Sequence, residues 1–214
     1  MFRNGFSMTF RMLVCFLFAT LIVFFCGDVA NAITEAECLE AIEVGNELIK
    51  ENPNSYRGYA SRGGAYGYLK KYDLAEKDLL KAISLSQSFA ALYVHLASVY
   101  FETKQYEKAV AASRKAVELG ADYQESYDAL LANLCSAKRY EECLKTCDEV
   151  LVKFPNDASA YFFKAISKSE LGTFASSEVM SDLVKAHSLK PEDGSINVLY
   201  DRAQAGKSIK LIDR

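Results

Sequence analysis

Residues of the same kind recur every 34 positions along this chain. One series contains only tyrosine: Tyr59, Tyr93, Tyr127 and Tyr161. A second series contains aromatic residues: Tyr72, Tyr106, Tyr140 and Phe174. A third contains small residues: Ala41, Ala75, Ala109 and Cys143. Because all three series keep the same step in one register, they indicate a single structural unit that is repeated along the chain.

Within each 34-residue unit the apolar residues follow the period of an α-helix. Tyr59, Gly63 and Tyr66 share one helix face, and residues 72–85 repeat the pattern after a short polar break at Lys70-Lys71. Each unit is therefore expected to form two amphipathic helices, and so short a break makes them antiparallel neighbours. One such pair cannot bury its apolar stripe alone, so an all-α array of stacked pairs is expected.

This pattern resembles the tetratricopeptide repeat family. In that family small residues lie where the two helices of a unit touch, an aromatic residue begins the second helix, and a proline often follows it. The corresponding small residues here are Gly63, Ala97, Ala165, Ala75, Ala109 and Cys143, and the prolines are Pro53, Pro155 and Pro191. The resemblance covers about residues 35–189. It implies a right-handed superhelical array, an α-solenoid, whose concave side is lined by the first helix of each unit.

The register also divides the chain. A signal segment or anchor is expected at residues 1–32 and a half repeat, similar to a second helix, at residues 33–55. Four repeats follow at 56–89, 90–123, 124–157 and 158–193, the last with a two-residue insertion. Residues 194–214 are expected to form a capping helix and tail, since polar residues such as Asn197 replace the apolar residues of a continuing repeat. Leu131 is large where a small residue is usual, which predicts a slightly opened third unit.

The N-terminal segment has the layout of a secretory signal peptide. Arg3 and Arg11 precede an apolar run at residues 12–26, and Ala30-Asn31-Ala32 provides small residues for cleavage after Ala32. The run is shorter than the roughly 20 apolar residues that a spanning helix needs. An exported protein, periplasmic or secreted, is therefore expected. The alternative is a single-pass protein whose only membrane attachment is an uncleaved anchor at residues 12–26.

The cysteines of the third unit allow two interpretations. Cys135 and Cys143 lie near the junction of the two helices, and Cys147 follows Cys143 on the same helix face. An oxidising compartment permits a disulfide from Cys135 to Cys143 or to Cys147, whereas the other interpretation is that all are small buried side chains. A metal site is not expected, because zinc normally takes four ligands and neither His95 nor His187 is placed nearby.

The sequence contains no recognisable arrangement of catalytic residues. The two histidines fall in different units, and most carboxylates stand beside lysines, as in Glu76-Lys77, which is typical of a solvated helix face. Gly63, Gly64 and Gly67 lack the preceding strand and following helix of a phosphate-binding loop. We therefore expect neither an enzyme nor a cofactor. A net charge of −3 gives no support for nucleic-acid binding.

The first helices are expected to line a concave groove that is mostly small and apolar. The predicted partner-binding residues are Arg57, Gly64, Tyr68, Val94, Phe101, Glu125, Asp128, Phe162 and Ile166. Aromatic rings act as anchors, and exposed apolar surface usually marks a contact. This predicts an interaction module, or scaffold, whose groove binds an apolar peptide or helix of another protein. The alternatives are a groove filled by superhelical packing or by the capping helix, and a structural subunit that self-associates through its terminal helices.

One branch of the family allows us to test whether this chain resembles the members that bind a chaperone. Some members hold the C-terminal carboxylate of a chaperone with a clamp of lysine, asparagine and arginine. The corresponding positions in this chain include Ala60, Gly64, His95, Glu125 and Ala129. Because these residues do not form such a clamp, the resemblance does not imply binding of a chaperone tail.

Overall fold

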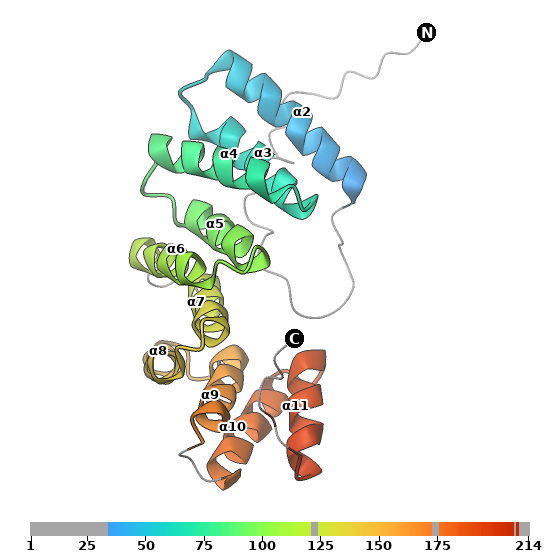
Figure 1. Cartoon of the computed structure of the whole chain (residues 1–214), viewed down its shortest axis with the longest axis vertical. Coiled ribbons are helices and arrows are strands. Elements are labelled where there is room, and N and C mark those ends of the chain that lie inside the picture. The colour runs from blue at the N-terminus through green and yellow to red at the C-terminus, as the bar shows by residue number, and fades with distance from the viewer. Residues whose placement is uncertain (1–33, 121–123, 173–175, 208, 210–214) are drawn as a thin grey trace.

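The computed structural model describes residues 34–120, 124–172, 176–207 and 209, and every regular element in them is an α-helix. The helices are α2 (Glu35–Glu51), α3 (Tyr56–Tyr68), α4 (Tyr72–Leu85), α5 (Ala90–Glu102), α6 (Tyr106–Leu119), α7 (Gln124–Ser136), α8 (Tyr140–Lys153), α9 (Ala158–Leu171), α10 (Ser176–Leu189) and α11 (Gly194–Gln204). Figure 1 shows them stacked in chain order as one array. The all-α architecture read from the sequence is confirmed. The apolar run at residues 12–26 and the expected cleavage site lie outside the described residues.

The second helices of the units follow the aromatic series closely. The helices α4, α6 and α8 begin at Tyr72, Tyr106 and Tyr140, so the aromatic residue stands at the first position of each. In the fourth unit the described part of α10 begins at Ser176, after residues outside the described ranges, so the expected two-residue insertion stays a prediction. The small-residue series is buried: Ala75, Ala109 and Cys143 are 0% exposed and Ala41 is 5% exposed.

The turn between the two helices has the same backbone in successive units. The residues at this turn have positive φ values of 56°, 59°, 58° and 66°: Lys70, Lys104, Lys138 and Gly172. In the first unit the N–H of Lys71 donates to the carbonyl of Tyr66 (2.8 Å), and the next two units repeat this bond. This is the Schellman ending of a helix, in which glycine is the usual residue with positive φ. Three units place lysine there instead.

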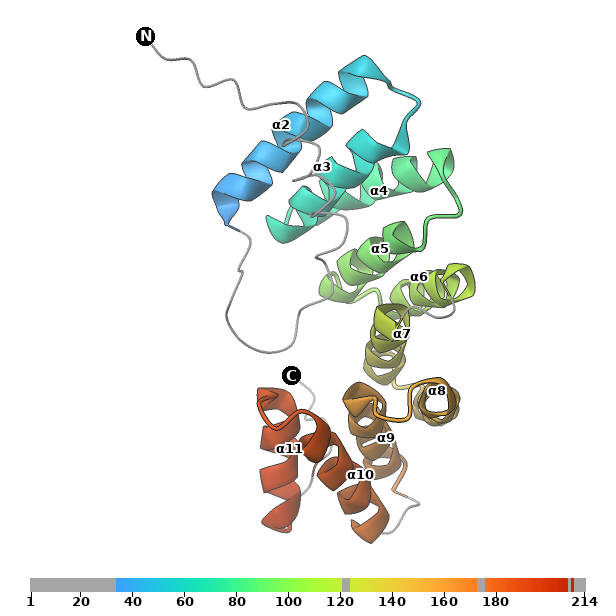
Figure 2. The same cartoon turned by 180° about the vertical axis from the view of Figure 1, so that it is seen from behind.

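The helices form two layers. Successive first helices α3, α5, α7 and α9 contact one another, and each second helix contacts the first helix of its own unit and of the next. Figures 1 and 2 show that the array curves, so that α2 and α11 lie on the same side of it. We call the side of α3, α5, α7 and α9 toward which the array curves the concave face.

Two glycine contacts set the distances between helices. A Cβ atom on Gly63 would lie 3.1 Å from Leu79 Cγ, which supports the close contact of α3 with α4 expected from the sequence. The crossing of α2 with α3 is closer still, since a Cβ on Gly58 would lie 2.9 Å from the carbonyl oxygen of Gly45. The half repeat therefore docks on the first full unit by backbone-to-backbone approach.

The third unit departs from its neighbours in the way that Leu131 predicts. Its two helices, α7 and α8, pack less closely than the helices of the other three pairs. Leu131 is fully buried between them, at the position that Gly63, Ala97 and Ala165 occupy in the other units. A larger side chain at the point of closest approach keeps the two helices further apart.

The helix α11 takes the place of a further first helix. The hydroxyls of Tyr59 and Tyr161 donate to the carbonyl of the proline six residues earlier (3.3 and 3.4 Å), and the side-chain amide of Asn197 makes the same bond (2.8 Å). Asn197 therefore replaces the tyrosine of the repeat, and Val198 is left 58% exposed. Of the helices in the described ranges, none is long and apolar enough to cross a bilayer.

Candidate functional site

The N-terminal end of the concave face is partly covered by α2. Of the residues predicted there, Arg57 is exposed, while Gly64 and Tyr68 are half-buried. Tyr68 packs against the cluster that joins α2 to α3, which contains Cys38 and Ala65. Burial raises the pKa of Tyr68. The Tyr68 ring therefore packs between α2 and α3 and is only partly accessible on the concave face.

The middle of the concave face leaves an aromatic ring accessible. Phe101 is 36% exposed and makes an edge contact with Tyr106, with ring centroids 5.9 Å apart. Ser98, one turn earlier on α5, is also exposed. Val94 is only 4% exposed, so the expectation that it lines the groove is wrong. Its side chain packs into the interior between neighbouring helices, which its helix position alone did not reveal.

The C-terminal end of the concave face is covered by α11. Phe162 is half-buried, and both Phe162 and Leu199 of α11 pack against the cluster around Ala165. Ile166 is 2% exposed, so the expectation that it lines the groove is also wrong. The helix α9 lies between α7 and α11, and its side chains pack in clusters with both helices. The alternative in which the capping helix fills the groove therefore describes this end of the array.

A polar group lies at the junction of α7 and α9. Asp157 caps α9 by accepting from the N–H of Ala160 (2.7 Å), and Gln124 Nε2 donates to the same carboxylate (2.5 Å). Asp128 lies nearby, and its Oδ1 is buried without a hydrogen-bond partner among the described residues. Burial, and then the charge of Asp157, raises the pKa of Asp128 to about 7. A hydrogen-bond donor or a cation from a partner would therefore stabilise this carboxyl group.

His95 is placed differently from a clamp residue. Burial lowers its pKa to about 4, so the imidazole is uncharged at neutral pH. Its Nδ1 is buried and has no hydrogen-bond partner within the described ranges. Without a positive charge at this position, or at Ala60 and Ala129, the face offers no ion pair to a terminal carboxylate at these points.

Three cysteines meet inside the third unit. Cys135 is 3% exposed, and Cys143 and Cys147 are 0% exposed. The sulfur atoms of Cys135 and Cys143 are 3.4 Å apart, and Ser167 Oγ lies 3.5 Å from the Cys135 sulfur. All three are free thiols in this structure. In the part of the chain that is described, no group of three or more His, Cys, Asp or Glu side chains is arranged to hold a metal ion.

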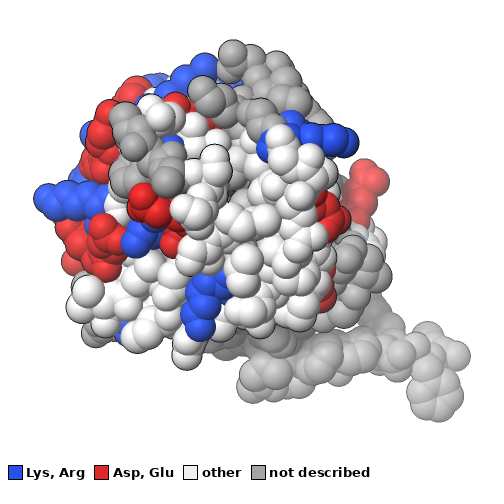
Figure 3. Space-filling model, turned by 90° about the horizontal axis from the view of Figure 1, so that it is seen from below, with Lys and Arg blue, Asp and Glu red and all other residues white. Residues whose placement is uncertain are grey.

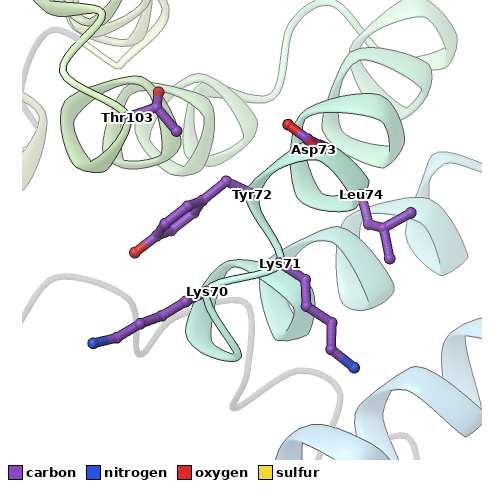
Figure 4. A pocket seen from close by; sticks show the side chains of 6 residues that line it. All are labelled: Lys70, Lys71, Tyr72, Asp73, Leu74 and Thr103. Carbon is purple, nitrogen blue, oxygen red and sulfur yellow. The ribbon is translucent and has the colours of Figure 1, made fainter.

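Two shallow pockets lie at junctions between helices. One, of about 320 Å³, lies at the turn between α3 and α4, where Figure 4 shows the lining side chains Lys70, Lys71, Tyr72, Asp73, Leu74 and Thr103. The other, of about 400 Å³, lies where α9, α10 and α11 meet and is lined in part by Lys168. Lys168 is paired with Asp182 (2.8 Å). Its charge is therefore used within the fold.

Comparison with known proteins places two of these units in a family. The family model of the tetratricopeptide repeat matches residues 56–89 and 90–123. The chain is 33% identical to Hsp70-Hsp90 organizing protein 3 of Arabidopsis thaliana over 89 residues, which are 42% of this chain and 16% of that protein. It is 30% identical to small glutamine-rich tetratricopeptide repeat-containing protein 2 of Saccharomyces cerevisiae over 118 residues, 55% of this chain and 34% of that protein. The chain thus spans only a small part of the relatives it matches.

Solved structures extend the likeness to most of the chain. A structure of MamA aligns with a TM-score of 0.65 at 18% identity and covers 96% of this chain and 97% of its own. YrrB, described as a TPR protein with an unusual peptide-binding site, aligns with a TM-score of 0.66 at 18% identity, covering 78% of this chain and 84% of its own. Similarity at this level of identity concerns the fold alone. The chain therefore contains tetratricopeptide repeats, and its described residues have the solenoid fold that such repeats form.

Proposed function

We propose that this chain is an exported, non-catalytic interaction module that binds an apolar peptide or amphipathic helix of a partner protein on its concave face. The repeats it contains are protein-interaction units in the relatives that it resembles. The observation that carries the proposal is the accessible ring of Phe101 in the middle of that face. A large aromatic side chain left partly in water on a curved surface is the kind of anchor that partner segments use.

The binding surface is the part of the concave face that α2 and α11 leave uncovered. We call it the central face, and it consists of Ala91, Ser98, Phe101, Glu125, Asp128 and Ala132. Its small side chains leave room for another chain beside the phenylalanine. The carboxyl groups of Glu125 and Asp128 lie at the α7 side of this surface, where they favour a lysine, an arginine or an N–H donor of the partner.

The proposal does not include binding of the charged end of a chain. Proteins called Hsp70-Hsp90 organizing proteins are similar to less than half of this chain. The clamp positions here include Ala60, Ala129 and an uncharged His95, so they supply no positive charge to a terminal carboxylate. We therefore favour an internal apolar segment of a partner over the charged end of a chain.

The proposal is tested by affinity capture from the cells that produce the protein. We expect Phe101→Ala to lose a partner that the wild-type chain retains after crosslinking. Phe89→Ala is the matched control, because Phe89 is 38% exposed, stands at the N-cap of α5 and packs against Tyr56, and it is not one of the residues of the central face. Equal loss with both variants, or retention with both, would contradict binding through the central face.

Export is the second part of the proposal, and it rests on the segment that precedes the described residues. Cleavage after Ala32 would leave Ile33 as the first residue of the exported protein. Determining the N-terminus of the protein isolated from its source tests this directly. An intact Met1 end on a membrane-bound protein would support the anchor at residues 12–26 instead.

Self-association through the terminal helices is the alternative function that an observation favours. Val184 on α10 and Val198 on α11 are 46% and 58% exposed. Figure 3, seen from the end where α10 and α11 lie, shows a broad area without charged side chains between acidic and basic groups. Light scattering decides between the two: a dimer that Val198→Asp converts to a monomer supports self-association, whereas a wild-type monomer supports the interaction module.

A further inference from the structure

The third unit brings two sulfur atoms together across a helix pair. Cys135 lies near the end of α7 and Cys143 in the first turn of α8, and their sulfur atoms are 3.4 Å apart. A disulfide bond is about 2.05 Å long. Rotation of both side chains about χ1 would bring the sulfur atoms within bonding distance.

The same two positions in the other units do not hold such a pair. They are occupied by Gly67 with Ala75 in the first unit and by Phe101 with Ala109 in the second. The third unit is also the one in which Leu131 keeps the two helices apart. The Cys143 thiol lies in the resulting space, where it donates weakly to the Leu131 carbonyl (3.7 Å). The sulfur pair thus occurs where noncovalent packing between the helices is weakest.

We propose that Cys135 and Cys143 form a disulfide that ties α7 to α8. Cys147 lies one turn after Cys143 on the same helix, and its side chain also interacts with Cys143. Cys147 remains a thiol, because residues four apart on one helix present parallel side chains rather than facing ones. The bond would fix the position of α7, and with it one side of the central face. It rests on the export part of the proposed function, because a disulfide persists in an oxidising compartment, and it stands whether or not the central face binds a peptide.

The oxidation is a two-electron exchange with a disulfide of another molecule. The Cys143 thiol loses its proton to water, and its sulfur attacks one sulfur of the partner disulfide, which releases one partner thiolate. The Cys135 sulfur, after losing its proton, then attacks the Cys143 sulfur of the mixed disulfide and releases the second partner thiolate. The protein loses two protons and two electrons, and the partner disulfide is reduced to two thiols.

Burial decides when this exchange takes place. With exposed fractions of 3% and 0%, neither sulfur is accessible to an oxidant once α7 and α8 have packed. The disulfide therefore forms while the chain folds, or when the third unit opens. The folded, reduced protein should react slowly with thiol reagents and also with oxidised glutathione.

The sequence allows an unambiguous map of the bond. Trypsin cleaves after Lys115, Lys138, Arg139, Lys145 and Lys153, so the three cysteines fall on separate peptides. The full chain is isolated from its source, and a second sample is refolded in a glutathione redox buffer. Both are alkylated at acidic pH without reduction. We expect peptide 116–138 joined to peptide 140–145, with peptide 146–153 alkylated.

Three results would overturn the proposal. One is three separate alkylated peptides in both the native and the refolded sample. Another is a bond that joins peptide 140–145 to peptide 146–153. Linkage in the refolded sample but not in the native one would show that the native compartment is reducing, and would overturn the bond as a feature of the protein in its cell.

Thermal unfolding provides a second readout with a matched control. A disulfide that closes so short a loop is expected to raise Tm by about 5–10 °C over the reduced protein. Cys147→Ala should keep this difference, because Cys147 is outside the bond. Cys135→Ala should abolish it. A difference between oxidised and reduced protein that survives in Cys135→Ala would assign the effect to another pair and contradict the inference.

Discussion

The close crossing of α2 with α3 allows us to predict how Gly58→Ala changes stability. Whether the protein is stabilised or destabilised depends on the backbone geometry at this crossing. Gly58 lies where the two helices are closest. A Cβ atom added to it would lie 2.8 Å from Ile49 Cγ1, 2.9 Å from the Gly45 carbonyl oxygen and 3.0 Å from the Ile49 amide nitrogen. Two of these three atoms belong to the backbone of α2, so they cannot be avoided by a side-chain rotation. In Gly58→Ala the whole helix must shift.

The magnitude follows from two opposing terms. Overpacking a close contact costs about 1–3 kcal/mol, and a backbone clash lies at the upper end of that range. Alanine is about 1 kcal/mol better than glycine in a helix interior, which offsets part of the cost. The net destabilisation expected for Gly58→Ala is about 2 kcal/mol, or a decrease in Tm of about 4–8 °C for a chain of this size.

Gly67→Ala is the matched control on the same helix. A Cβ atom there would meet only Val99 Cγ2, at 3.8 Å, which is an ordinary van der Waals contact. The gain in helix propensity is then unopposed, and stability should rise by up to about 1 kcal/mol. Thermal unfolding followed by circular dichroism at 222 nm measures both variants, and hydrogen exchange in α2 shows whether the loss is local to that helix.

The two substitutions are chemically identical and differ only in what the added methyl group meets. They should therefore move Tm in opposite directions. A Gly58→Ala protein that is as stable as the wild type would show that α2 does not pack on α3 at the distance described. Destabilisation of similar size in both variants would show that glycine is needed for flexibility of α3 rather than for the crossing.

Three further predictions concern charge and backbone strain. Asp78→Asn removes the carboxylate that holds Arg62 through two bonds of 2.6 and 2.9 Å, and urea unfolding should show a loss of about 2–3 kcal/mol. Lys104→Gly relieves a φ of 59° and should raise stability by about 0.5–1 kcal/mol in the same assay, whereas a loss would mean that the turn is not strained. The raised pKa of Asp128, about 7, means that the folded state binds its proton more tightly than the unfolded state. Stability should therefore be fully present below pH 4 and fall as the pH rises toward 7, and Asp128→Asn should remove this decline when unfolding is measured at pH 5 and pH 8.

The sequence predicts the array well because its information is periodic. The step between tyrosines gives the unit, the spacing of apolar residues gives two helices, and the short breaks make the helices antiparallel. Leu131 predicts the opened third unit. Each of these features is local, or is repeated often enough to be read without knowing any tertiary contact.

The turn lysines show what a local reading misses. Lys70, Lys104 and Lys138 occupy a backbone position that glycine usually fills. In the sequence, only Gly172, 34 residues after Lys138, indicates that this position has a positive φ. The closing of each helix pair therefore depends on the register of the repeat and not on the turn residue itself, since the packed helices supply the free energy that holds a lysine at positive φ.

The concave face is predicted less well, because the register tells which way a side chain points but not what packs over it. Val94 and Ile166 are buried by neighbouring helices. Phe162 is half-buried because α11 continues the array, and Asn197 keeps the hydrogen bond of the tyrosine it replaces. A capping helix that follows the register so closely covers α9 as a further repeat would.

The extent of the uncovered surface then limits what can bind. With α2 packed near Tyr68 at one end and α11 on Phe162 at the other, the surface left for a partner is centred on α5 and α7. Two neighbouring helices with axes about 8–10 Å apart present a surface about 20 Å wide. An extended chain crosses that width with about six residues at ~3.3 Å each. The central face therefore fits a short segment with one aromatic-binding position and one basic or donor position near Asp128, rather than a long helix held along the whole array.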